Sequence, residues 1–434
     1  RNFKFVARTV AVRIVQAVSV TVVACCRTVA IAIARTVGNA FTYNHHTQEN
    51  AKSLAEAGGV LALVSMMNDI DEDEISKKAF TTLTSMGAIA IDVIIGHIAA
   101  LSIGVKGCMG IGRGLEPVEG SARPSEEVVA TLEGIASSEL VVNYYRHASV
   151  QTEEEGGGRS TSSESRSHMA VVWGMLGKLL PVLNGMVYSD SDLREYVWRH
   201  GQGLAVLLHV VTRSLPLELR VVTVYTLANL TQSHNEQLQR EAARLGSIRV
   251  LAALMHEVQR NDLSDSDEDG AGGGDRESRM ARRSDTCCVI MQVLDNLVHQ
   301  SHDNIHQLVY EGGQEPDGSG PRLLESIVRC CVDSTEPDLR NEAAGVLLSV
   351  VEMAIEEGGQ MLRRVTGSAE KGPPGDSSGD SSGGANVVST LKLLSESFDS
   401  SLTSALKARA GQCVRELEEE GMHRSSNSRG STRK

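Results

Sequence analysis

The chain has 434 residues, a formal net charge of −13, and a composition that is 41% hydrophobic but only 3% aromatic. The acidic balance disfavours nucleic-acid binding as the main function, because phosphate contacts require a basic face. Few aromatic side chains are available to stack on bases. A basic segment of another protein is a more natural partner, and the hydrophobic fraction is sufficient for a continuous buried core.

Residues 1–48 contain no Asp or Glu and carry six basic side chains. This composition is typical of an organelle transit peptide, but the segment runs directly into the first of the repeats described below. We therefore expect it to form the first helices of a repeat array. The apolar run at 88–105 contains Asp92 and His97, which are unfavourable inside a bilayer. This run predicts a pair of buried helices and not a membrane span.

One phrase recurs along the chain. An Asn closes an apolar helical run, a polar segment follows, and a glycine opens another apolar run; the phrase occurs at Asn39, Asn229 and Asn296. Repetition at a roughly constant interval indicates an α-solenoid, in which each unit packs only on its neighbours.

Aligning the chain on this phrase gives the interval between units. The aligned positions are Asn39, Ser85, Gly134, Gly177, Asn229, Asn296 and Ser349. Most intervals approach the roughly 40–47 residues of three-helix repeats once two polar insertions are removed.

The clearest unit, residues 190–231, contains three helical pieces. Asp190 predicts an N-cap for a helix over 193–200, which the following glycines end. A short apolar helix covers 204–211. Pro216 then opens a third helix, at a position where proline is tolerated.

These units resemble armadillo repeats. The resemblance is carried by Thr-Leu-Ala-Asn-Leu at 226–230 and by Glu-Ala-Gly-Gly-Val-Leu-Ala-Leu-Val at 56–64, and it covers most of residues 25–355. It implies an all-α fold, a right-handed α-solenoid of about seven three-helix repeats with disordered insertions.

Composition shifts predict the domain boundaries, because segments poor in apolar residues do not bury enough surface to fold. A capping helix or hairpin is expected where apolar residues return at helical spacing. The expected segments are a repeat array over 1–366 with insertions at about 151–167, 261–284 and 314–321, a disordered Gly/Ser/Pro linker at 367–386, the capping element at 387–420, and a disordered basic tail at 421–434.

The resemblance also implies a binding site. In armadillo proteins the Asn of the third helix lines a concave groove, where its amide pairs with the backbone of an extended peptide. Side chains one turn earlier share that face of the helix. The candidate groove residues are Asn39, Asn229 and Asn296, with Arg35, Tyr225, Gln292 and Trp173 beside them. The alternative is that the Asn residues bridge neighbouring repeats.

The importin-α subclass holds basic localisation signals with a regular Trp-x-x-x-Asn array. Here Trp173 is the only tryptophan at such a place, and Gly177 stands where the Asn would be. The sequence therefore does not carry the regular array of that subclass.

No constellation of residues predicts catalysis or a metal site. None of the eight cysteines forms a CxxC motif, so we expect buried thiols in a reducing compartment. The spacing of His299, His302 and His306 suits zinc, but no Cys or acid completes a site, and surface or capping roles are expected. The acidic run at 265–270 resembles the start of a calcium loop, but Arg276 stands where the final Glu ligand is needed.

We therefore expect a non-enzymatic scaffold or adaptor, located in the cytoplasm, without metal or cofactor; an additional nuclear location is left open. Its concave groove would bind an extended, basic segment of a protein partner. A regulator that acts on a small GTPase or a kinase through the same array is the alternative, since some armadillo proteins do so.

Overall fold

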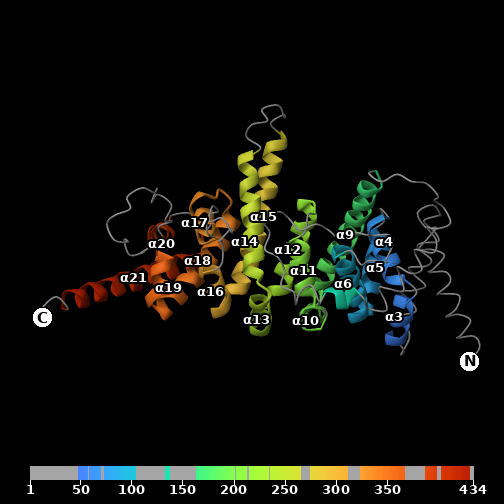
Figure 1. Ribbon diagram of the computed structural model, residues 1–434, viewed down its shortest axis with the longest axis horizontal. Helices are drawn as coiled ribbons and strands as arrows, with labels where there is room; N and C mark the ends of the chain where they lie inside the picture. Colours follow the sequence, from blue (N-terminus) through green and yellow to red (C-terminus); the bar gives the residue numbers. More distant parts are fainter. Residues whose placement is uncertain are drawn as a thin grey trace, which may run out of the picture. The chain divides into compact units, whose positions relative to one another are not determined.

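A computed structural model gives the three-dimensional structure (Figure 1). The described residues are 47–56, 58–69, 73–103, 132–136, 163–200, 202–212, 215–233, 235–264, 274–310, 323–366, 387–397 and 402–430. All regular secondary structure within these ranges is helical, which confirms the all-α prediction for this part of the chain. The chain forms two compact units: unit 1 ends at Leu230, and unit 2 begins at Thr231.

Unit 1 contains eight labelled helices. They are α3 (Thr47–Glu56), α4 (Gly59–Asp69), α5 (Asp73–Met86), α6 (Ala88–Ile103), α9 (Ser163–Ser189), α10 (Ser191–Arg199), α11 (Gly203–Val211) and α12 (Leu217–Thr231), the last of which ends at the unit boundary.

Unit 2 contains nine labelled helices. They are α13 (Glu236–Arg244), α14 (Ser247–Ser264), α15 (Gly274–Val298), α16 (His302–Tyr310), α17 (Leu323–Asp333), α18 (Pro337–Glu357), α19 (Gly359–Thr366), α20 (Val387–Glu396) and α21 (Ser404–Gly430). These nine helices form three successive groups of three. Each group consists of a helix of eight or nine residues, then a helix of intermediate length, then a longer helix.

Two apolar helices form the centre of unit 1. All nine residues of α11 are buried, and twelve of the sixteen residues of α6 are buried. A helix that is apolar on every side must be covered on every side. Here α6 and α11 pack on each other, and α9 and α10 pack on α6.

The three helical pieces predicted within residues 190–231 are present as α10, α11 and α12. Asp190 is the N-cap of α10, where its carboxylate accepts hydrogen bonds from the backbone N–H groups of Asp192 and Leu193. Pro216 immediately precedes α12, and its carbonyl accepts from the Leu219 N–H at 3.0 Å. Local capping chemistry was therefore sufficient to place these helix starts.

Gly87 separates α5 from α6 and has a φ of +58°, a left-handed conformation that glycine adopts at low cost. The two helices are bent by 102° at this point. No single helix in the described ranges is long and apolar enough to cross a membrane; α5 and α6 meet that test only as a bent pair, by length and composition.

Asp92 is the acidic residue in the otherwise apolar α6. Its side chain is exposed, and both carboxylate oxygens accept from the Tyr196 hydroxyl of α10, at 3.0 and 2.9 Å. Burial and this hydrogen bond raise the pKa of Tyr196 to about 12, so the phenol keeps its proton. The carboxylate therefore connects α6 to α10.

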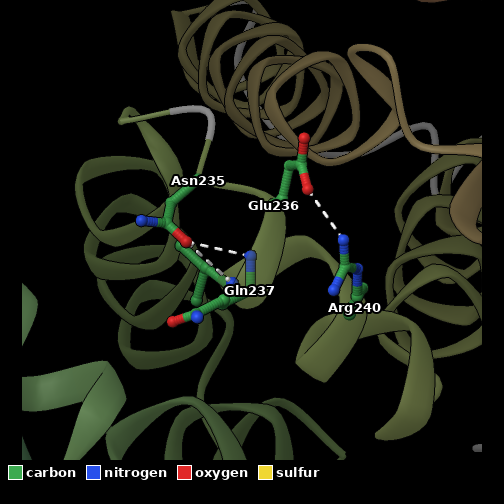
Figure 2. A network of polar contacts seen from close by, with 5 residues as sticks. Asn235, Glu236, Gln237 and Arg240 are labelled. Atoms are coloured by element: carbon green, nitrogen blue, oxygen red, sulfur yellow. Dashed lines mark hydrogen bonds and ion pairs between the residues drawn. The ribbon is translucent and has the colours of Figure 1, made fainter.

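Unit 2 begins with a capped helix that Figure 2 shows from close by. The Asn235 side-chain oxygen accepts from the backbone N–H groups of Gln237 and Leu238, at 2.9 and 3.3 Å, and so caps α13. One turn separates Glu236 from Arg240, and they form an ion pair at 2.7 Å. The next helix, α14, follows Gly246, whose φ is +71°.

The long helices α15 and α18 pack against each other in unit 2, and α17 and α21 pack on α18. The capping element expected at 387–420 consists of two helices, α20 and α21, that pack on each other. Lys392 of α20 and Glu418 of α21 form an ion pair at 2.8 Å between them.

Three segments expected to be disordered are helical in part. Helix α9 begins at Ser163, inside the 151–167 insertion; α14 ends at Ser264 and α15 begins at Gly274, inside 261–284; and α21 continues to Gly430, inside 421–434. Each extends a helix that is anchored by buried residues. Extending an existing helix requires no new nucleation, so polar helix formers suffice. The segments 314–321 and 367–386 lie outside the described residues.

His97 of α6 makes the stability of unit 1 depend on pH. Burial lowers the pKa of this imidazole to about 3 from 6.5. Below about pH 6.5 the unfolded chain binds a proton at this histidine that the folded chain does not bind. The free energy of unfolding therefore decreases as the pH falls from about 6.5 towards 3. We expect unit 1 to lose about 2 kcal/mol between pH 7 and pH 5 from this group alone.

Urea unfolding followed by tryptophan fluorescence measures this loss, because both tryptophans, Trp173 and Trp198, belong to unit 1. The variant His97→Gln should be less sensitive to pH over this range than the parent. Equal pH dependence in the two proteins would contradict the assignment.

Candidate binding faces of the long helices

Two contacts fix how α9 and α12 lie beside each other in unit 1. The Asn229 side-chain amide donates to the Asn184 side-chain oxygen at 2.8 Å. Seven residues earlier on α9, a Cβ at Gly177 would lie 3.5 Å from the Leu219 side chain of α12. The residue that comes later in α9 contacts the residue that comes later in α12. The two helices are therefore parallel.

These contacts bear on the alignment made from the sequence. The sequence aligns Gly177 with Asn229, and in the structure the side chain that bonds to Asn229 is Asn184, which stands 45 residues before it. Seven residues are about two helical turns, so either choice places the residue on almost the same side of α9. Helical spacing in the sequence indicates on which side of a helix a residue lies. Only the packing of the helices shows which turn lies beside a given neighbour.

Trp173, Asn184 and Tyr188 lie at spacings that share one side of α9, and Tyr225 and Asn229 share one side of α12. We call these five residues the aromatic–amide face. The structure places the two predicted aromatic residues, Trp173 and Tyr225, on it with 36% and 39% of their surface exposed.

Trp173 and Tyr225 occupy different turns within this face. With α9 and α12 in the register given above, they are separated by on the order of 12 Å along the helices, at 1.5 Å per residue. The amide pair Asn184–Asn229 lies in the same strip of surface. Two amides that share one hydrogen bond keep both donors and acceptors for another group.

Asn296 of α15 has a different environment. It is only 7% exposed, and its side-chain amide donates to the Thr231 hydroxyl at 3.2 Å. Its backbone carbonyl accepts from the Gln239 side chain of α13 at 2.9 Å. These contacts agree with the alternative in which the Asn bridges neighbouring helices. Gln292, one turn earlier, is half-buried.

A buried polar network beside Asn296 was not foreseen from the sequence. The Asn304 side chain of α16 is fully buried, and its amide donates to the carbonyls of Gln239 and Leu297 and to the Ser301 hydroxyl, at 2.9–3.0 Å. Gln239 also donates to the His299 carbonyl at 2.8 Å. The sequence contains only a weak signal of this network: Asn304 and Gln239 each stand next to apolar residues in a short helix.

The two remaining predicted groove residues, Arg35 and Asn39, lie outside the described part of the chain. The three histidines predicted to have surface or capping roles, His299, His302 and His306, are exposed, and His302 pairs with Glu357. Within the described residues, no three potential ligands gather closely enough to hold a metal ion.

The cysteines of unit 2 carry no sign of nucleophilic chemistry. Cys287, Cys330, Cys331 and Cys413 are buried, and Cys288 is half-buried. Burial raises the pKa of the Cys287, Cys330 and Cys413 thiols to about 12. A thiol is a nucleophile only as the thiolate, so these residues contribute to packing.

Comparison with known proteins gives little. No family model and no curated protein matches the chain. One similar solved structure bears the description "A conserved phosphorylation switch controls the interaction between cadherin and beta-catenin in vitro and in vivo". It shares 11% identity, with 96% of this chain and 84% of that chain covered, at a TM-score of 0.32. A likeness of this size does not bear on function.

The two described Asn residues should respond differently to truncation. We expect Asn296→Ala to lower the free energy of unfolding by about 1–2 kcal/mol, because it removes the donor to the buried Thr231 hydroxyl. Asn229→Ala, at a half-buried position, should lower the free energy of unfolding by less than about 1 kcal/mol. Denaturant titrations followed by circular dichroism measure both. A larger loss for Asn229 would show that its main role is to hold α9 and α12 together.

Proposed function

We propose that the chain is an armadillo-like scaffold or adaptor: a right-handed α-solenoid of about seven three-helix repeats that binds an extended segment of a protein partner. We further propose that it acts in the cytoplasm and has no catalytic activity of its own. The observation that carries the binding proposal is the aromatic–amide face of α9 and α12.

Three properties of this face suit an extended peptide. Trp173 and Tyr225 offer large, partly exposed aromatic surfaces, and such residues dominate the energetics of protein interfaces. The amide pair Asn184–Asn229 lies in the same surface and offers donors and acceptors to a peptide backbone. Gly177, between Trp173 and Asn184, lies against the Leu219 side chain of α12 and so brings the two helices of this face together.

A photo-crosslinking experiment tests where a partner binds. A benzophenone amino acid placed at position 225 should crosslink the partner in cell extract, and the same residue at position 198, in α10, is the control. Mass spectrometry identifies the captured protein and the crosslinked segment. Equal capture at both positions would indicate non-specific contact and contradict the assignment of the face.

Truncation of the aromatic side chains tests the energetics. We expect Trp173→Ala combined with Tyr225→Ala to weaken binding of the captured segment by at least about tenfold, because loss of a single aromatic anchor worth about 1.4 kcal/mol already reduces affinity by that factor. The unfolding midpoint should change little, since both side chains are partly exposed. Isothermal titration calorimetry measures affinity, and Trp198→Phe is the matched aromatic control. Undiminished affinity in the double variant would refute the role of this face.

A further inference from the structure

The exposed aromatic side chains gather on the aromatic–amide face. Within the described ranges, five large hydrophobic side chains are exposed, and the three aromatic ones, Trp173, Tyr188 and Tyr225, all belong to this face. Tyr188 is the most exposed of them, at 68%. The two aliphatic ones, Val332 and Leu393, belong to unit 2. Aromatic side chains gathered in one exposed strip mark an interaction site.

The three rings follow one another along the two helices at similar intervals. Trp173 and Tyr188 are separated by about 22 Å along α9, at about 1.5 Å per residue. Tyr225 lies about halfway between them, because Asn229, one turn after it, is bonded to Asn184, one turn before Tyr188. Each interval is roughly 12 Å, the length of about four residues of a polyproline II helix, which rises about 3.1 Å per residue. A segment of about eight such residues therefore spans all three rings.

The amide pair in this face has N–H groups to offer. Each side-chain amide carries two N–H bonds, and the hydrogen bond between Asn229 and Asn184 uses only one of them. Among the described residues, neither amide makes a further hydrogen bond, and neither nitrogen is buried, so the remaining N–H groups face solvent. The Trp173 indole adds a nitrogen that is only a donor. The face is therefore rich in hydrogen-bond donors.

Charged side chains are few near this face, and none belongs to it. On the same side of α12, the nearest acidic residue is Glu218, two helical turns before Tyr225. On α9 between Trp173 and Tyr188, the single charged residue is Lys178, which is half-buried. Neither sign of charge predominates, so the face does not select a strongly charged segment by electrostatic attraction.

We propose that the aromatic–amide face binds a proline-rich segment of a protein partner in the polyproline II conformation. This inference rests on the proposed scaffold function and adds to it the chemistry of the partner. Proline-rich segments dock on surfaces lined by aromatic side chains. Such a segment has backbone carbonyl acceptors but few N–H donors, which complements a surface rich in donors. Its conformation is restricted before binding, so less conformational entropy is lost when it binds.

The test uses the full chain with Trp198→Phe, which leaves Trp173 as the only tryptophan. Decaproline is added and the emission of Trp173 is recorded, because a proline ring packed on the indole excludes water and shifts the emission to shorter wavelength. A Gly-Ser peptide and a Lys-Ser peptide of the same length are the controls. Decaproline should bind at least about tenfold more tightly than either control.

Two results of this titration would overturn the proposal. The first is tighter binding of the Lys-Ser peptide than of decaproline, which would assign the face to a basic segment. The second is an emission shift that appears with rising protein concentration and no peptide, which would assign the face to a second copy of the chain.

Asn184→Asp separates donor chemistry from shape. The change keeps the size of the side chain and an acceptor for the Asn229 N–H, so α9 and α12 stay linked, but a carboxylate oxygen replaces the N–H donors. Decaproline affinity should fall by about fivefold, the equivalent of one neutral hydrogen bond. The Lys-Ser peptide should bind more tightly, and the unfolding midpoint should change little.

The matched control is Gln237→Glu, which makes the same chemical change at an exposed position of α13. Decaproline affinity should be unchanged in this variant. Equal loss in the two variants, or undiminished affinity with Asn184→Asp, would refute recognition of carbonyl groups by the amide pair.

The segment captured at position 225 supplies a second test. It should be rich in proline, and Glu218→Gln should leave its affinity unchanged, whereas a basic segment would bind more weakly to this variant. If position 225 captures a segment without proline and decaproline does not bind, only the present proposal fails. If decaproline binds at Trp173 but no partner is captured, the scaffold function fails while the preference of the face for proline stands.

Discussion

The register between parallel helices determines which side chains each unit presents. Two long helices can slide past each other by a turn and still bury similar apolar surface, so apolar packing alone defines the register weakly. In unit 1 the hydrogen bond between Asn184 and Asn229 links α9 and α12 in one register. Trp173 and Tyr225 are carried by these two helices, so their relative positions follow from that register.

Two residues in the same sequence phrase, Asn229 and Asn296, have different roles because their neighbours differ. Asn229 is half-buried and bonded to another amide, whereas Asn296 is enclosed by Thr231 and Gln239. The Asn296 amide donates to the buried Thr231 hydroxyl, and an amide that is buried and bonded in this way holds helices in place and leaves little for a ligand. Of these two residues, only Asn229 therefore lies where a ligand could reach it.

The helix starts, which depend on residues close together in the chain, could be predicted from the sequence. The features that depend on packing between helices could not. Asp190 and Pro216 located the starts of α10 and α12, because capping acts within one turn. The sequence placed Gly177 and not Asn184 opposite Asn229, since a shift of two turns preserves the helical face. The helical residues after Gly274 were missed because their polar composition conceals the anchoring that the buried part of α15 provides.

The complete burial of α11 has a consequence for the dynamics of unit 1. Amide protons in a helix without a solvent-facing side exchange with water only when the helices around it separate, so local fraying contributes little. The slowest-exchanging amides of unit 1 should therefore cluster in Gly203–Val211. Their exchange rates would report the free energy of opening the whole unit, and a change in those rates on adding a partner would measure coupling from a surface site to the centre.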